Sequence, residues 1–296
     1  MKQENKSKIM LILAMTIWGT IGIFRRYIPM SSGMIAFTRG CIGTLFLVLV
    51  ILITRKKISF EAIKKNLILL IVSGALMAIN WILLFEAYKY TSVATATVCY
   101  YMEPVFVMLA SPLFLREKLS VKKVICIIVS LGGMVLVSGI TGMEEFKFGE
   151  IKGVLLGLGA AILYASVVII NKKIKDIGAY DKTIVQLGTS VVTVVPYMLL
   201  AENISAVKFE PVSIIMLVLV GVLHTGVAYT LYFGSMGNVK AQTIALFSYI
   251  DPVVAIILSA LILREKIGIL EICGSILVLG ATLVSEMPLF EKKTLL

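Results

Sequence analysis

The chain has 296 residues, of which 59% are hydrophobic and only 15% are charged. Soluble domains average roughly 45–50% apolar and about 25% charged residues, so this composition argues against a soluble domain with one large core. The net charge of +11 does not indicate a nucleic-acid partner, because Lys and Arg stand almost entirely between apolar runs, as in the loops of membrane proteins.

The apolar residues fall in runs of about 20, the length that an α-helix needs to cross a bilayer. Ten such spans fit the chain, at residues 8–28, 31–53, 66–88, 93–115, 121–139, 151–171, 182–201, 212–235, 241–263 and 268–286. The first follows several lysines, as in a signal peptide, but no small-x-small cleavage site follows it, so it is interpreted as a retained helix. The expected fold class is all-α integral membrane.

The short loops between the spans carry unequal numbers of basic residues. With the N-terminus inside, 19 of the 28 Lys and Arg residues lie in cytoplasmic segments and eight lie on the other side. Basic residues collect in the cytoplasmic loops of membrane proteins. This bias predicts a multi-pass protein of the plasma (inner) membrane with both termini in the cytoplasm.

Two stretches of the chain repeat each other. Residues 101–118 and 249–266 align at an offset of 148, and nine of the eighteen aligned positions are identical. Both stretches hold an acidic residue followed by Pro, a long apolar run and a final Arg-Glu-Lys. Two unrelated apolar helices would not share the Pro and the Arg-Glu-Lys in one register, so the pattern indicates an internal repeat of about half the chain.

The repeat predicts an architecture. Each half holds five spans, an odd number, so the second half must insert upside down relative to the first. We therefore expect ten transmembrane helices as two inverted five-helix repeats, residues 1–142 and 143–296. Residues 116–118 are then expected on the cytoplasmic side and residues 264–266 on the outer side.

Motifs in both halves carry a family resemblance. In the first half they are Tyr88-Lys89-Tyr90-Thr91-Ser92-Val93-Ala94-Thr95-Ala96, Tyr101-Met102-Glu103-Pro104-Val105 and Leu115-Arg116-Glu117-Lys118. In the second half they are Ala241-Gln242-Thr243, Tyr249-Ile250-Asp251-Pro252 and Leu263-Arg264-Glu265-Lys266. Together they resemble the signature of the EamA family, within the drug/metabolite transporter superfamily. The resemblance covers essentially the whole chain and implies a ten-helix secondary transporter, often an exporter of amino acids or other small metabolites.

Glu103 and Asp251 each precede a proline inside a span, Pro104 and Pro252. A proline inside a helix removes a backbone hydrogen bond and frees a carbonyl, so both prolines are predicted helix breaks. A carboxylate at such a break is a candidate to bind a substrate amine or to carry a proton, since ionisable groups in a membrane are costly. The alternative is that each carboxylate binds an Arg, Tyr or backbone donor and stabilises the repeat.

Two further groups are candidate proton carriers. Glu86 lies near the end of the third span, and it would be a proton carrier if it faced a cavity. Lys89 stands three residues later on the same helix face, so an ion pair is the alternative. His224 is the single histidine, and the unperturbed pKa of a histidine suits a proton relay, whereas a lone histidine can also be a hydrogen-bonding packing residue.

Arg39 is the only basic residue away from the ends of a span, and its counterpart in the second half is Gln186 after a one-residue adjustment. A guanidinium in a cavity can bind a carboxylate or phosphate through two parallel hydrogen bonds. Pairing with Glu103 or Glu86, or extension of the side chain to the membrane interface, are the alternatives.

Aromatic residues offer apolar faces with polar tips, which suits a cavity wall, although Trp and Tyr also form belts at membrane interfaces. Trp81 and Tyr229 are matched by the repeat, and Tyr101 and Tyr249 stand beside the proline breaks, so these four are the preferred cavity residues. Gln242 is a further polar candidate. We expect the first, third, fourth, sixth, eighth and ninth spans to enclose the cavity.

Other function classes lack their motifs. The chain has no phosphate-binding loop and no Ser-His-Asp or H-E-x-x-H arrangement, so neither ATP-driven pumping nor an enzyme is expected. Its four cysteines lie inside apolar runs without C-x-x-C spacing, and one histidine cannot form a multi-histidine site. No cofactor and no metal are expected.

The predicted function is secondary transport of small metabolites by alternating access, with proton coupling as a hypothesis. Arg39 with intramembrane carboxylates suits a zwitterion such as an amino acid, and export is the direction that the resemblance implies. The partners are then a small-molecule substrate, the lipid bilayer and protons, with no nucleic acid, and the protein is expected to be a monomer or a homodimer. The open alternatives are a passive channel and a facilitator or exchanger for drug-like or sugar-like solutes.

Overall fold

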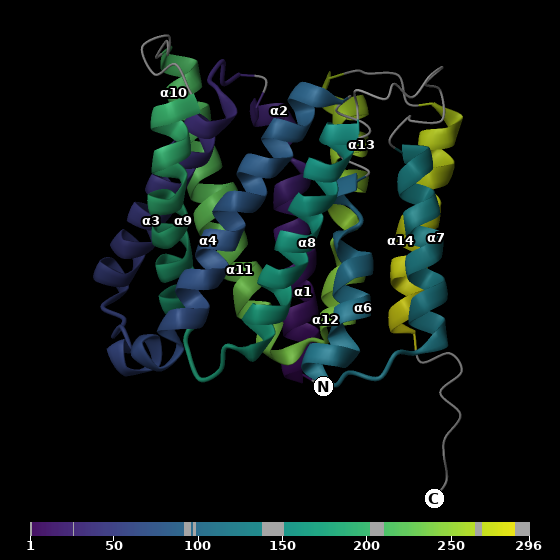
Figure 1. Ribbon diagram of the computed structural model, residues 1–296, viewed down its shortest axis with the longest axis horizontal. Helices are drawn as coiled ribbons and strands as arrows, with labels where there is room; N and C mark the ends of the chain where they lie inside the picture. Colours follow the sequence, from purple (N-terminus) through teal and green to yellow (C-terminus); the bar gives the residue numbers. More distant parts are fainter. Residues whose placement is uncertain are drawn as a thin grey trace, which may run out of the picture.

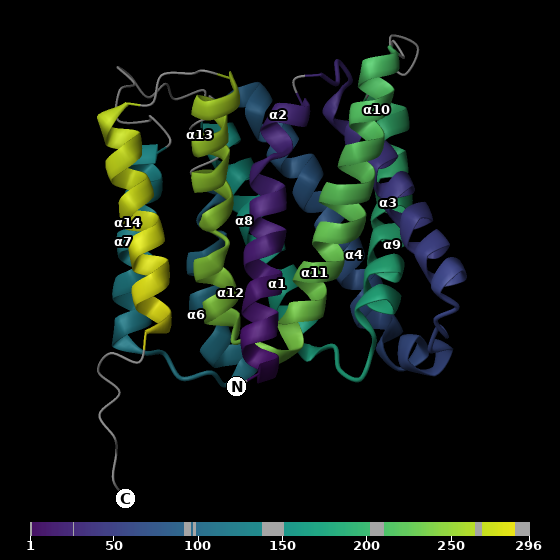
Figure 2. The same ribbon diagram turned by 180° about the vertical axis from the view of Figure 1, so that it is seen from behind.

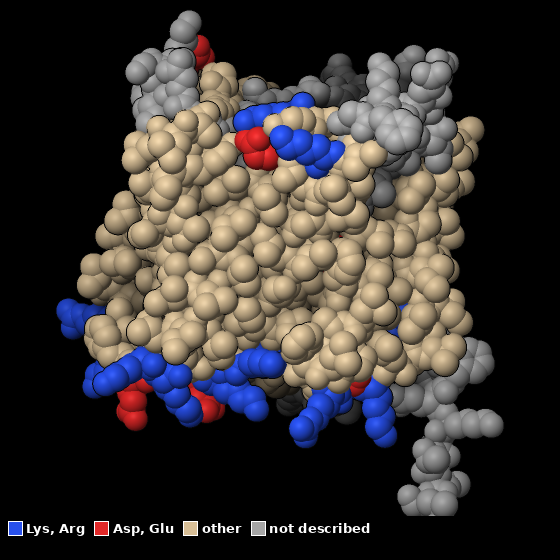
Figure 3. Space-filling model, viewed as in Figure 1, with Lys and Arg blue, Asp and Glu red and all other residues tan. Residues whose placement is uncertain are grey.

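The structure is a computed structural model that describes residues 2–25, 27–91, 96, 99–137, 151–201, 210–263 and 268–287. Every regular element within these residues is a helix. The long helices run side by side between two faces of the molecule (Figure 1). We call the face where the first helix begins and the last helix ends the basic face, because most Lys and Arg residues visible in Figure 3 lie on it. The other is the opposite face.

The first half contains α1 (Lys2–Gly19), α2 (Ile21–Arg25), α3 (Ser32–Thr54), α4 (Phe60–Tyr90), α6 (Glu103–Leu115) and α7 (Val121–Val137). The second half contains α8 (Ile151–Lys173), α9 (Ala179–Ala201), α10 (Pro211–Leu219), the π-helix η4 (Val220–Val227), α11 (Ala228–Ser235), the short η5 (Met236–Asn238), α12 (Ala241–Phe247), α13 (Ile250–Leu263) and α14 (Ile269–Glu286). Three spans are made of successive segments: α1–α2, α10–η4–α11 and α12–α13. The expected all-α fold of ten spans is confirmed.

The side of the molecule between the two faces is apolar. Within the part of the chain that the structure describes, five helices are long and apolar enough to cross a membrane, at Gly33–Thr54, Phe60–Leu84, Ile151–Lys173, Ala179–Ala201 and Pro211–Asn238. Side chains such as Leu200, Leu113 and Ile68 are at least 78% exposed. Figure 3 shows a band nearly free of charged residues at this level. Such a surface is stable against lipid and unfavourable in water, so the chain is a multi-pass membrane protein.

Contacts between helices come in pairs that are related by exchanging the two halves. In the first half, α4 packs against α9 and α8. The counterpart of α4 is the span of α10, η4 and α11. It packs in the same way, η4 against α3, the counterpart of α9, and α11 against α1, the counterpart of α8. Helix α6 packs against α8, as α13 packs against α1, and Figure 2 shows α1 beside both α11 and α13. The matched helices α7 and α14 contact each other, as do α3 and α9. A pseudo-two-fold axis in the membrane plane produces this pattern, so the two inverted five-helix repeats are confirmed.

Both acidic-Pro pairs begin a helix. A two-residue turn at 101–102 precedes α6, and another at 248–249 separates α12 from α13. Pro104 and Pro252 therefore stand in the first turn of a helix, where the missing N–H has no intrahelical partner to lose. Glu103 and Asp251 lie in the same first turns, where the helix dipole favours a negative charge. The interruption is thus the turn before each pair.

The first Arg-Glu-Lys motif joins the two repeats at the basic face. The Glu117 carboxylate accepts a hydrogen bond from the backbone N–H of Ala241, the first residue of α12, at 3.0 Å. The Gln242 amide donates to the backbone carbonyl of Lys118 at 3.2 Å, and the Lys123 ammonium donates to the Thr243 hydroxyl at 2.7 Å. A loop of the first repeat therefore caps a helix of the second. The matching residues 264–267 lie outside the described residues.

Glu117→Ala is expected to lower the free energy of unfolding by about 1 kcal/mol, because it removes an acceptor from the N-terminus of α12. Thermal unfolding of the purified protein in detergent measures this loss. Glu210→Ala is the matched control, because Glu210 is the N-cap residue of α10 and its side chain makes no capping hydrogen bond. Equal unfolding temperatures for the two variants would contradict a capping role for Glu117.

Candidate functional site

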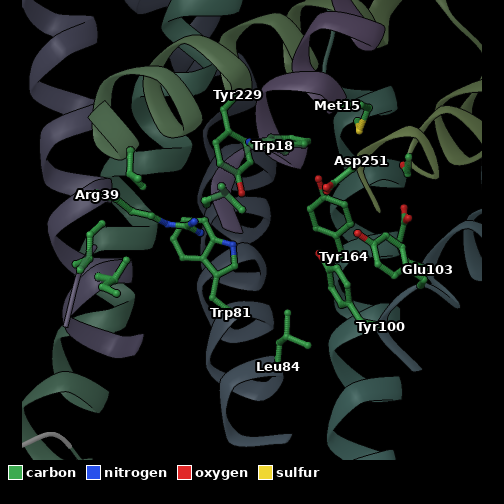
Figure 4. Close-up of a pocket in the computed structure, with 16 residues that line it drawn as sticks. Met15, Trp18, Arg39, Trp81, Leu84, Tyr100, Glu103, Tyr164, Tyr229 and Asp251 are labelled. Atoms are coloured by element: carbon green, nitrogen blue, oxygen red, sulfur yellow. The ribbon is translucent and has the colours of Figure 1, made fainter. Parts of the chain in front are cut away.

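A cavity of about 440 Å³ lies among the helices in the half of the molecule nearer the opposite face. It is lined by Met15, Trp18, Ile21, Ile28, Ile35, Arg39, Trp81, Leu84, Tyr100, Tyr101, Glu103, Tyr164, Val220, Tyr229, Ser248 and Asp251. Figure 4 shows these side chains, with Arg39 on one side and Glu103 and Asp251 on the other. All six spans expected to enclose a cavity contribute to its wall, and α3 contributes as well.

Several residues matched by the repeat line this cavity together. The matched lining pairs are Trp81 with Tyr229, Tyr100 with Ser248, and Glu103 with Asp251, all at the offset of 148, and Trp18 with Tyr164 at an offset of 146. The cavity therefore lies on the pseudo-two-fold axis. Ser248 was not among the predicted site residues. Its place in the repeat, 148 residues after Tyr100, could have identified it.

Aromatic rings make up much of the wall. The rings of Trp18 and Tyr229 meet edge to face at 4.9 Å, and those of Tyr100 and Tyr164 lie 6.1 Å apart. The Trp18 indole N–H donates to the backbone carbonyl of His224 at 2.8 Å, which orients its ring. Such a wall presents flat apolar surfaces together with a few hydroxyl groups, which suits an organic solute better than a hydrated ion.

Arg39 is a cation without an anionic partner among the described residues. Its guanidinium carbon lies 4.2 Å from the centre of the Trp81 ring. The Nε atom is buried and has no hydrogen-bond partner. Glu86 and Glu103, the two partners considered from the sequence, do not pair with it. A guanidinium stacked on an aromatic ring keeps its N–H groups directed at an anion, so the cavity has a binding point for a carboxylate or phosphate.

The opposite wall carries the two carboxylates. The Glu103 residue is 3% exposed, and its Oε1 atom is buried without a hydrogen-bond partner in the described structure. The Asp251 carboxylate is hydrogen-bonded to the Tyr101 side chain. Neither carboxylate has a cationic side chain within ion-pair distance among the described residues, so both are open to a cationic group or a proton from the cavity.

Four of the predicted site residues lie outside the cavity wall. Glu86 accepts hydrogen bonds from Lys89 and from the Tyr197 hydroxyl, both at 2.5 Å, which links α4 to α9. Gln242 lies at the basic face, where it also donates to the Ser111 hydroxyl at 3.2 Å. Both side chains thus have protein partners, in contrast to Arg39.

Tyr249 and His224 stand directly behind the wall. The Tyr249 hydroxyl donates to the backbone carbonyl of Tyr101 at 3.1 Å. The His224 Nε2 atom lies 2.7 Å from the Thr20 hydroxyl, which itself donates to a carbonyl at 2.7 Å. This contact joins α1–α2 to the eighth span. His224 stands in the π-helix η4, an irregularity often found at functional sites.

Two lysine side chains bond to backbone carbonyls near the basic face. The Lys182 ammonium donates to the carbonyl of Phe233 at 3.2 Å, and the Lys172 ammonium donates to the carbonyls of Met236 at 2.9 Å and Val239 at 2.5 Å. Toward the opposite face the wall of the cavity continues through isoleucines, of which Ile28 lies between helices α2 and α3. Polar bonds thus join helices near one face, and apolar side chains line the cavity toward the other.

Comparisons with known proteins agree with this architecture. The model of the EamA-like transporter family matches the chain twice, at residues 5–139 and 151–287. A protein of Bacillus subtilis described as "Uncharacterized transporter YxxF" is 28% identical over 277 residues, which cover 94% of this chain and 88% of that protein. Human "Solute carrier family 35 member G1" is 31% identical over 141 residues, 45% of this chain and 38% of that protein.

One solved structure, described as "Crystal structure of protein", shares the fold with a TM-score of 0.84. It is 17% identical in sequence, and the match covers 95% of this chain and 96% of the other.

Proposed function

Because this chain belongs to the EamA-like transporter family, we propose that it exports amino acids or related small metabolites across the plasma (inner) membrane by alternating access. The family membership makes it a transporter, and the substrate class rests on one observation. The cavity holds an unpaired guanidinium at Arg39 on one side and the carboxylates of Glu103 and Asp251 on the other. A zwitterion satisfies both ends at once, and the aromatic walls accept its side chain.

Alternating access is supported by a difference between the two faces of the molecule. Bonds from Lys172 and Lys182 join helices near the basic face, whereas isoleucines near the opposite face line the cavity. We propose that the basic face is cytoplasmic, since basic residues collect on that side of a membrane. Both chain ends are then cytoplasmic, and the state described here is directed outward.

Counterflow in proteoliposomes tests this function. Vesicles preloaded with pools of unlabelled amino acids, organic cations or sugars are assayed for uptake of the matching labelled tracer. Saturable counterflow with the amino acid pool is expected. Counterflow with only the cation or sugar pool would overturn the proposed substrate class, and an unsaturable leak would indicate a passive channel. A facilitator or exchanger gives the same counterflow and is separated from a proton-driven exporter by the proton measurements below.

Proton coupling is part of the proposal, and Glu103 is its best-placed carrier. Glu103→Gln is expected to abolish substrate accumulation driven by a pH gradient, while counterflow persists, because the amide keeps the shape of the side chain but cannot release a proton. Accumulation and counterflow are measured in the same vesicles. A variant that accumulates substrate as the wild type does would exclude Glu103 as the carrier.

Glu86→Gln is the comparison variant, since Glu86 is bound to Lys89 and Tyr197 outside the cavity wall. It is expected to retain accumulation within about two-fold, in line with the small energies of exposed ion pairs. His224→Ala completes the set of candidate carriers. If all three variants accumulate substrate normally, none of these residues couples transport to protons.

A further inference from the structure

Helices α3 and α9 are matched elements of the two repeats. Each has 23 residues, and they begin at Ser32 and Ala179. Arg39 and Gln186 are both the eighth residue of their helix. Both helices also make the same type of contact, α3 with η4 and α9 with α4. Arg39 and Gln186 therefore hold equivalent places in the inverted repeats.

Their surroundings nevertheless differ. Arg39 lines the cavity and lacks an anionic partner among the described residues. Gln186 is fully buried, does not line the cavity, and donates to the Ser73 hydroxyl at 2.5 Å and to the Asn171 side-chain oxygen at 3.1 Å. Arg39 is available to a ligand in this state, whereas the amide nitrogen of Gln186 is bound to protein groups and its Oε1 atom is buried without a hydrogen-bond partner in the described structure.

The two residues also lie at different depths. Helix α3 begins at the opposite face and α9 begins at the basic face (Figure 1). Arg39 is therefore nearer the opposite face and Gln186 nearer the basic face. The matched lining pairs Trp81 with Tyr229 and Glu103 with Asp251 are alike in kind, and Tyr100 with Ser248 are both uncharged. Arg39 with Gln186 therefore introduces the main difference in charge between the two directions of access.

Two repeats with the same fold have the same two conformations available to them. Because they insert in opposite directions, an exchange of conformations between them turns an opening at one face into an opening at the other. After this exchange, Gln186 takes the place relative to the cavity that Arg39 has now.

On this basis, which rests on the proposed function, we propose that Arg39 and Gln186 are alternately exposed contacts for the anionic group of the substrate. A guanidinium meets that group from the opposite face, and a neutral amide meets it from the basic face. Charge-assisted hydrogen bonds are markedly stronger than neutral ones, so the half-saturating concentration is expected to be at least about ten-fold lower on the Arg39 side.

This asymmetry bears on direction. A protein that exports such a substrate must release it from the tighter side, so export requires a low outer concentration or a driving proton. An exchanger has no such requirement. Tighter binding from the opposite face therefore favours the exchanger alternative.

Cysteine labelling tests the proposal without a substrate. The native residues Cys41, Cys99, Cys126 and Cys273 are first replaced by Ser or Ala. Arg39→Cys and Gln186→Cys are then introduced separately and treated with a membrane-impermeant thiol reagent, in intact cells or in inverted vesicles. Lys57→Cys, at an exposed residue of the loop between α3 and α4, marks which preparation presents the basic face. Ser190→Cys, one turn from Gln186 and fully buried, is the silent control.

The Arg39→Cys variant is expected to react at least about ten-fold faster from the opposite face, and the Gln186→Cys variant only from the basic face. Equal reaction of the Arg39→Cys variant from both faces would overturn the proposal, as would an unreactive Gln186→Cys variant that folds. Labelling of Ser190→Cys as fast as Gln186→Cys would show general loosening and overturn it too.

Sided transport provides the second measurement if the Gln186→Cys variant does not fold. Half-saturating concentrations from the two faces are expected to differ at least about ten-fold in the wild type and to agree within about two-fold in Arg39→Gln. Equal values in the wild type would overturn the proposal. If the labelling gave the expected result but no pool gave counterflow, the proposed substrate class would be contradicted and the alternate exposure of Arg39 and Gln186 would stand.

Discussion

Arg39→Gln is expected to raise the half-saturating concentration for a zwitterionic substrate by about 10- to 150-fold. This range corresponds to the roughly 1.5–3 kcal/mol that a hydrogen bond to a charged group contributes. The glutamine retains a hydrogen-bond donor but loses the charge and the stacking of the guanidinium on Trp81, which lies 4.2 Å away. Initial rates of counterflow at increasing substrate concentration measure the change.

The matched control is Arg39→Lys, which keeps the charge but not the planar fork. It is expected to fall between the wild type and Arg39→Gln, because an ammonium binds a carboxylate at one point only. A substrate analogue without its carboxylate should be transported equally by all three proteins. If Arg39→Gln left the half-saturating concentration of the intact zwitterion unchanged, the anion would not bind at Arg39.

Gly19→Ala is expected to lower the stability of the protein by about 1–3 kcal/mol and to disrupt the cavity. A Cβ atom at Gly19 would lie 2.6 Å from the backbone oxygen of Asp251 and 2.7 Å from the Cβ of Val254. The first contact is with backbone, which cannot rotate away, so α1 and α13 would have to separate. Since Asp251 lines the cavity, the separation also displaces a carboxylate of the site.

Unfolding temperature in detergent and counterflow rate measure both effects of Gly19→Ala. Gly188→Ala is the control, because a Cβ at Gly188 meets nothing within 4 Å. In that open space the substitution should be neutral or stabilising by up to about 1 kcal/mol, since alanine is the better helix former. A Gly19→Ala protein that matched Gly188→Ala in both measurements would show that α1 and α13 are not held at this distance.

Much of the architecture followed from local features of the sequence. A run of about 20 apolar residues has one stable arrangement in a bilayer, because its backbone groups must bond within the helix. An odd number of spans per repeat then leaves only the inverted arrangement. The same repeat located Glu103 with Asp251 and Trp81 with Tyr229, and each pair lines the cavity.

The partners of individual side chains did not follow from the sequence in the same way. Glu86 and Glu103 are both acidic residues inside predicted spans, yet one binds Lys89 and Tyr197 and the other lines the cavity. Which of these places an acidic residue reaches depends on how its helix is rotated about its own axis. A helix that is apolar on all sides gives no sequence pattern from which that rotation could be predicted. Gln242 likewise is a buried polar residue whose partners, Ser111 and Lys118, lie more than 120 residues away.

The sequence by itself determined the number of spans, their inverted repetition and the matched pairs of residues, because apolar length and residue order are properties of the chain alone. The tertiary structure alone decided that Arg39 has no anionic partner among the described residues while Gln186 is bound inside the protein. These two residues occupy the same helix position, and only the packing of the two repeats, each in its own conformation, makes one of them available to a ligand.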